Sequence, residues 1–195
     1  AMIAVHLPRL AVEGFLGLEA LGYFAPILAL AMAPSRLIHA LGMAATARLA
    51  RHHAAGERGP FVALLGKMVL GAGALGLVGV LFTARFGDWV LRSVYREEYV
   101  QYAGLLVLVV GAATIRFMSD VLQFGMIASR RFWWLTIQYG SVAAVAVAAC
   151  WLLIPDHGLE GAGLAVLLVS TVQLAVIAFG LVRNLPAPRR SEAAG

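Results

Sequence analysis

The sequence YAGLLVLVVGAATIRFMSDVLQFGMI, residues 102–127, is an apolar run that carries Arg116 and Asp120 near its middle. A run of this length predicts a membrane-spanning helix, because about 20 residues rising about 1.5 Å each cross the hydrocarbon core. An ionised side chain at that depth costs roughly 2.5–3.5 kcal/mol on insertion scales, so it should face protein, water or a partner. Arg116 and Asp120 share one helix face with Ser119 and Gln123. The run therefore predicts a helix whose polar face lines a polar interior.

The composition of the whole chain agrees with a membrane protein. Of its 195 residues, 62% are hydrophobic and 13% are charged, whereas soluble domains carry about 25% charged residues. The basic residues behind the net charge of +5 punctuate apolar runs instead of gathering in one block, so nucleic-acid binding is not indicated. The single cysteine, Cys150, lies inside an apolar run and cannot form an intrachain disulfide. We expect an all-α integral membrane protein.

The apolar runs predict six membrane-spanning helices in one bundle over residues 1–184, at residues 2–18, 23–50, 61–86, 102–127, 132–154 and 161–182. Pro26 and Pro34 should bend the second helix. The glycines of the third predict close packing through small residues rather than a phosphate-binding loop, since no Gly-Lys-Ser/Thr follows them. Residues 51–60 should form a polar loop, residues 87–101 an interfacial segment, and residues 185–195 a disordered tail.

The distribution of basic residues predicts one orientation. If the chain begins in the cytoplasm, ten of the fifteen basic residues fall on the inner side, and only Arg85, Arg92 and Arg96 fall on the outer side. Basic residues favour the cytoplasmic side of short loops. We therefore expect both termini in the cytoplasm.

The charged residues within the predicted helices are the candidate site. Arg116 and Asp120 either line a transport cavity or form a buried pair that locks helices together. Arg36 and His39 present a second basic face just after Pro34, suited to an anionic substrate or, alternatively, to snorkelling or helix pairing.

A secondary candidate pair lies in the first predicted helix, where Arg9 and Glu13 are spaced to neutralise one another. Weaker polar stripes, Gln138 with Ser141 and Ser170 with Gln173, favour hydrogen bonds between helices.

Catalytic and metal-binding motifs are missing from the sequence. It holds no nucleophile elbow, no Walker motif, no His-Glu-x-x-His and no cluster of aspartates suited to magnesium. We therefore expect neither an enzyme nor a cofactor or metal.

The opening stretch LPRLAVEGFLGLEALGYFAPI, residues 7–27, resembles the start of the second half of bacterial polysaccharide flippases, the O-antigen-type lipid-linked oligosaccharide exporters of the MOP superfamily. The matching positions are Arg9, Glu13, Phe15-Leu16-Gly17 and Ala20-Leu21-Gly22-Tyr23. Further likenesses are Pro155, Gly158 and Gly161-Ala162-Gly163 before a late helix, and residues 91–106 before an earlier one, with Gly87 at the family's glycine.

The resemblance implies one lobe of a two-lobed MOP-type transporter in the bacterial inner membrane. Such flippases have about twice as many spans, so we expect either the carboxy-terminal half of a longer protein, which the Ala-Met start favours, or a half that dimerises. The implied function is moving undecaprenyl-pyrophosphate-linked oligosaccharide for surface polysaccharide biosynthesis, with the polymerase and glycosyltransferase machinery as possible partners. Alternatives are another exporter of drugs or lipid precursors, and a non-transporting membrane subunit of a glycan-synthesis complex.

Overall fold

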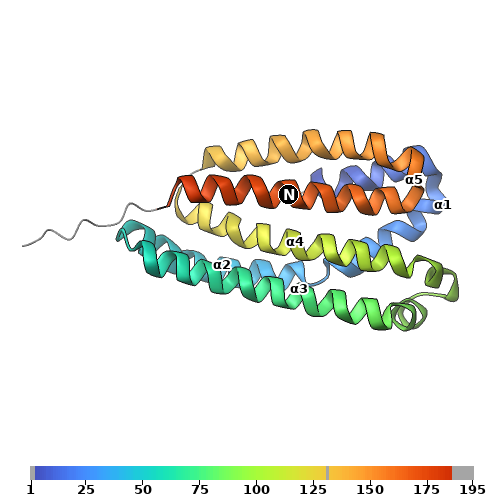
Figure 1. The fold of residues 1–195 in the computed structure, drawn as a ribbon, viewed down its shortest axis with the longest axis horizontal. Coiled ribbons are helices and arrows are strands. Elements are labelled where there is room, and N and C mark those ends of the chain that lie inside the picture. Colours follow the sequence, from blue (N-terminus) through green and yellow to red (C-terminus); the bar gives the residue numbers. More distant parts are fainter. Residues whose placement is uncertain (1–2, 131, 186–195) are drawn as a thin grey trace, which may run out of the picture.

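The computed structural model describes residues 3–130 and 132–185, and all its regular elements within these ranges are helical. In chain order they are α1 (Ile3–Met32), α2 (Ser35–Ala54), α3 (Arg58–Val94), the 3₁₀ helix η1 (Glu97–Tyr102), α4 (Ala103–Ala128) and α5 (Phe132–Arg183). The helices lie roughly along one common axis (Figure 1). The predicted disordered tail falls, apart from Leu185, outside the described residues.

Four helical stretches are long and apolar enough to cross a membrane, namely Pro8–Ala54, Arg58–Val94, Glu97–Ala128 and Phe132–Arg183. Membranes admit helices because every backbone amide and carbonyl is then hydrogen-bonded within its own segment. The prediction of an all-α fold is therefore confirmed, and the four apolar stretches agree with a membrane protein.

Two glycines break the helical geometry of α1 and α5. Gly17 in α1 has φ 87° and ψ 176°, and Gly158 in α5 has φ 57° and ψ −132°. Residues with a side chain rarely adopt either conformation. α5 doubles back at its break, so its two arms lie side by side (Figure 1), and Val142 and Ala146 of one arm pack on Val169 of the other.

The breaks correct the predicted turns. The turn expected after residue 18 lies instead at Gly17, and residues 155–160 are helical except for the reversal at Gly158, with Pro155 inside the helix. Helical geometry therefore persists closer to the reversals than the pattern of apolar runs indicated.

Pro34 divides the second predicted span, whereas Pro26 lies inside α1. α1 ends at Met32 and α2 begins at Ser35, with Pro34 between them as the N-cap of α2. Pro34 has no amide to donate to the Leu30 carbonyl, which instead accepts from the amide of Ala33 at 3.2 Å. The predicted bend at Pro34 is confirmed, and it is sharp enough to end one helix and start another.

Pro26 frees a second carbonyl, that of Gly22, inside α1. The hydroxyl of Tyr99 in η1 donates to this carbonyl at 3.1 Å, and the hydroxyl of Tyr95 donates to the carbonyl of Pro26 at 3.0 Å. The rings of Tyr95 and Tyr99 are stacked at 4.9 Å. The tyrosines expected at a membrane interface thus also hold α1 against the segment between α3 and α4.

Helices extend further than predicted around the polar segments. α2 continues to Ala54 and α3 begins at Arg58, which leaves little of the loop expected at residues 51–60. α3 passes a distortion at Phe86 and continues to Val94, so the first half of the expected interfacial segment is helical. The charged and aromatic residues of this segment therefore do not end the helix.

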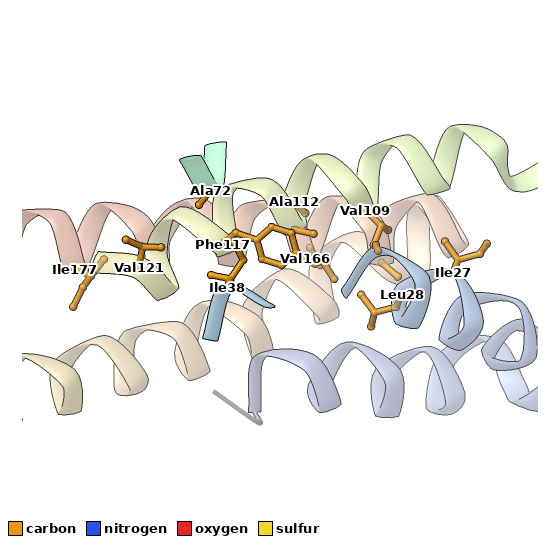
Figure 2. Close-up of a cluster of buried hydrophobic side chains, with 14 of the residues drawn as sticks. Ile27, Leu28, Ile38, Ala72, Val109, Ala112, Phe117, Val121, Val166 and Ile177 are labelled. Atoms are coloured by element: carbon orange, nitrogen blue, oxygen red, sulfur yellow. The ribbon is translucent and has the colours of Figure 1, made fainter. Parts of the chain in front are cut away.

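α4 is the centre of the fold, and its bounds agree with the predicted residues 102–127 to within one residue. It packs against α1, α2, α3 and α5. Figure 2 shows the apolar side chains gathered along it, including Ile27, Ile38, Ala72, Val109, Ala112, Phe117, Val121, Val166 and Ile177. The stretch expected to organise the chain therefore lies at the middle of its packing.

The two ends of the bundle differ in charge. One end, which we call the basic end, holds the α2–α3 and α4–α5 turns and the end of α5 (Figure 1). Its basic residues are Arg48, Arg51, Arg58, Arg130 and Arg183. The other end holds η1 and the reversal of α5, with Arg92 and Arg96 near it (Figure 1). Five of the ten basic residues expected on the cytoplasmic side thus lie at one end of the bundle, and the side of the membrane that this end faces stays a prediction.

Candidate functional site

The candidate site is a cavity of about 580 Å³ between α2 and α4, next to the end of α1. It brings together four of the charged or titratable residues expected from the sequence. Its lining consists of Met32, Ser35, Arg36, His39, Ala40, Arg116 and Asp120. Residues about eighty positions apart in the chain therefore face one space.

The approach of α2 to α4 assembles this cavity. Arg36 and His39 share a face in the first turns of α2, directly after the break at Pro34. One turn further along, Gly42 packs on the ring of Phe124, where a Cβ would overlap the ring atoms. The His39 ring meets the same phenyl group edge-on, with 5.2 Å between centroids. Absence of a side chain at Gly42 thus lets the two helices come close enough to share the cavity.

Asp120 contacts residues of two helices. Its Oδ2 lies 3.9 Å from Nε of Arg116, and its Oδ1 accepts from Nε2 of Gln173 in α5 at 3.4 Å. Both distances exceed the 2.7–2.9 Å typical of strong charge-assisted hydrogen bonds. The carboxylate therefore links α4 with α5 but is not tightly clamped, and it can accept further donors from the cavity.

Arg116 is 8% exposed although it lines the cavity. A buried guanidinium is strongly favoured when a carboxylate stands beside it, because the interior screens charges less than water does. The predicted pairing of Arg116 with Asp120 is confirmed. The pair lies at the wall of the cavity, and Asp120 also bonds Gln173 of α5.

Ser119 and Gln123 do not line this cavity, which corrects the prediction for the polar face of α4. Ser119 is fully buried, and its hydroxyl has no hydrogen-bond partner among the described residues. Gln123 is also buried, and its amide oxygen accepts from the hydroxyl of Tyr139 at 3.4 Å. Ser119 is therefore enclosed by protein, and Gln123 turns toward Tyr139 of α5.

The secondary candidates lie elsewhere. Glu13 is exposed, Arg9 has a buried Nε without a hydrogen-bond partner among the described residues, and no ion pair joins the two. The predicted Arg9–Glu13 pair is therefore not formed. Within the described part of the chain, no three His, Cys, Asp or Glu side chains group to hold a metal ion.

Other residues at the site carried weak sequence signals. Gln173 was expected to bond between helices and does so, through Asp120. Its companions Ser141 and Ser170 instead donate to carbonyls of their own helix, at 2.9 and 2.8 Å. Ser35 and Tyr139 were missed, since neither a serine after a proline nor a tyrosine near a helix start stands out in a membrane sequence.

Comparisons with protein-family models, with curated proteins and with solved structures each found no match to this chain.

Proposed function

We propose that the chain is one lobe of an alternating-access transporter that moves undecaprenyl-pyrophosphate-linked oligosaccharide across the bacterial inner membrane for surface polysaccharide biosynthesis. The observation that supports it is the cavity lined by Arg36, His39, Arg116 and Asp120 within apolar helices. Ionisable residues at membrane depth mark substrate or ion pathways by default. The likeness of residues 7–27 to polysaccharide flippases is the second support, and it alone suggests the oligosaccharide.

The proposed topology has six spans with both termini in the cytoplasm. The stretches Pro8–Ala54 and Phe132–Arg183 each contain a glycine break, so each is counted as two crossings. Each arm of α5 would rise about 38 Å as a helix, enough for a hydrocarbon core of about 30 Å. The basic end then faces the cytoplasm. A second lobe, from a longer chain or a second copy, would close the cavity.

In this mechanism the guanidinium groups of Arg36 and Arg116 bind the pyrophosphate. Planar guanidinium donors suit phosphate oxygens because they form paired hydrogen bonds. Asp120 positions Arg116 in the resting state. Proton uptake by Asp120 would weaken its attraction for Arg116 and so strengthen the cavity's hold on an anion, which couples substrate binding to proton binding.

Binding of undecaprenyl pyrophosphate to the purified chain in detergent tests the proposal. Arg36→Gln and Arg116→Gln should each weaken binding about tenfold or more, the effect of losing one charge-assisted hydrogen bond. Arg85→Gln is the matched control, because Arg85 is exposed and does not line the cavity. Unchanged affinity in both cavity variants would refute the assignment of these arginines.

The alternative of a non-transporting subunit predicts that water does not reach the charged residues. Cys150 is buried, so a Cys150→Ala background leaves one introduced thiol. A membrane-impermeant thiol reagent should label Ala40→Cys at the cavity and spare Ala112→Cys in the core. If both cysteines were equally protected from the reagent, the non-transporting subunit would be favoured. If a drug slowed the labelling of Ala40→Cys and undecaprenyl pyrophosphate did not, a different exporter would be favoured.

A further inference from the structure

A second cavity, which we call the apolar groove, lies between α2, α3 and α4 and is separate from the proposed transport cavity. Its volume is about 470 Å³, and side chains such as Ile38, Leu41, Met68 and Leu75 line it. The charged residues of its lining are Arg48 of α2 and Lys67 of α3. An apolar hollow with cations but no carboxylate in its lining suits a molecule that is apolar along its length and anionic at its head.

The groove continues into a polar space. Arg48 also lines a neighbouring cavity of about 370 Å³, whose other lining residues are Arg51, His52, Ala55 and Glu57. Glu57 is bonded to His52, with 2.7 Å between Oε2 and Nδ1, so the carboxylate is already engaged. Arginines from the last turns of α2 thus stand where the apolar surface ends.

The order of residues along the helices matches the order of chemistry in a lipid. From Ile38 to Arg48 α2 rises about 15 Å, and Arg48 is near the basic end of the bundle. α3 runs antiparallel from Arg58, which brings Lys67 to the same part of the groove. Long cationic side chains reach toward headgroups while their stems cover apolar surface. Phosphate would therefore meet the cations when an acyl chain lies in the groove.

We propose that the apolar groove and the polar cavity beside it bind an anionic phospholipid of the surrounding membrane. One acyl chain occupies the groove, and its phosphate lies among Arg48, Lys67 and Arg51. Basic pockets between membrane helices bind lipid headgroups in this way, each nearby cation adding attraction. The inference needs only that α2 and α3 lie in a bilayer, so it does not depend on the proposed transport.

The structure supplies a variant that fills the groove without disturbing the bundle. Gly71 lines the groove, and a Cβ at this position meets no atom within 4 Å. Gly71→Leu should therefore occupy the space of the acyl chain. Gly66→Leu is its matched control, because Gly66 is on the same helix, faces equally open space and does not line the groove.

The experiment is native mass spectrometry of the full chain, released from bilayers containing phosphatidylglycerol or phosphatidylcholine with the same acyl chains. We expect retained phosphatidylglycerol in the wild type. Arg48→Gln and Lys67→Gln should each reduce it about fivefold, and Gly71→Leu should reduce it further. Gly66→Leu and Arg183→Gln, a basic-end control outside both cavities, should bind as the wild type does.

Three outcomes would overturn this inference. One is equal retention of the two phospholipids, and a second is unchanged retention in Gly71→Leu, provided its helical content equals that of the wild type. The third concerns a Leu75→Cys variant, in which two copies could form a disulfide across the groove. If this disulfide formed equally well with and without phosphatidylglycerol, a second copy of the chain, and not a lipid, would cover the groove. None of these outcomes bears on Arg36 or Arg116, so the proposed function is tested separately.

Discussion

Replacing Gly76 by alanine tests how α3 packs against α4. An added Cβ would lie 2.6 Å from Cβ of Thr114 and closer still to its γ atoms. Thr114 resists turning away, because it is β-branched and its hydroxyl donates to the Val110 carbonyl at 2.9 Å. The two helices must therefore separate to admit even one methyl group.

The expected loss of stability follows from two opposing effects. Overpacking a well-packed interface costs about 1–3 kcal/mol, and the better helix propensity of alanine returns at most about 1 kcal/mol. We therefore expect Gly76→Ala to lower the free energy of unfolding by about 1–2 kcal/mol. Gly71→Ala meets no atom within 4 Å, so it should be neutral or slightly stabilising.

The assay is unfolding in mixed micelles of increasing dodecyl sulfate content, followed by circular dichroism. Thr114→Ala removes the two γ atoms that an alanine at Gly76 would strike first but keeps Cβ, which would still lie 2.6 Å away. The double variant should therefore recover part of the lost stability, about 1 kcal/mol of coupling energy. Equal stability of Gly76→Ala and Gly71→Ala, or no rescue by Thr114→Ala, would refute the packing argument.

Three further outcomes are expected. Tyr99→Phe removes the hydroxyl that donates to the Gly22 carbonyl, and it should lower the free energy of unfolding by about 0.5–1.5 kcal/mol in the same micelle assay. An unchanged midpoint would show that water can donate to this carbonyl equally well. Burial, and after it the neighbouring Tyr99, raises the pKa of Tyr95. An unfolded tyrosine ionises first, near pH 10, so the contribution of Tyr95 to the free energy of unfolding should be fully present below about pH 10. It should be lost as the pH rises toward the higher pKa of the folded state, and the free energy of unfolding should fall less steeply with pH in Tyr95→Phe. Gly158→Ala should lower the free energy of unfolding by about 1–2 kcal/mol, because Gly158 has a positive φ that alanine rarely adopts. Gly140→Ala in the same helix should have no such effect, and equal thermal midpoints of the two variants would contradict this prediction.

Much of the fold was predictable from local patterns. The apolar run at residues 102–127 became α4 almost residue for residue, and Pro34 divides α1 from α2 as its missing amide requires. The first reversal was placed just after residue 18 instead of at Gly17, whereas the reversal at Gly158 lies within the predicted gap at residues 155–160. Neither could be assigned to one glycine, because nothing local distinguishes a glycine with positive φ from one such as Gly76 that is needed for close packing.

The candidate site was predictable in part. Charges within apolar runs identified Arg36, His39, Arg116 and Asp120, because such residues are costly in lipid and must find a polar environment. The same reasoning included Ser119 and placed it at the cavity, although it is buried against neighbouring helices. Helix periodicity defines a face of about a third of the circumference, and only the neighbouring helices determine which part of that face borders an opening.

The sequence by itself determined that this chain forms apolar helices and that a few ionic groups must lie among them, since lipid offers no hydrogen bonds to the backbone and solvates charge poorly. The tertiary structure alone decided which of those groups meet. That depends on the approach of α2 to α4 at Gly42 and Phe124 and on the amide of Gln173 reaching Asp120 from α5. These contacts join residues far apart in the chain, and close packing of side chains, which no local pattern encodes, brings them together.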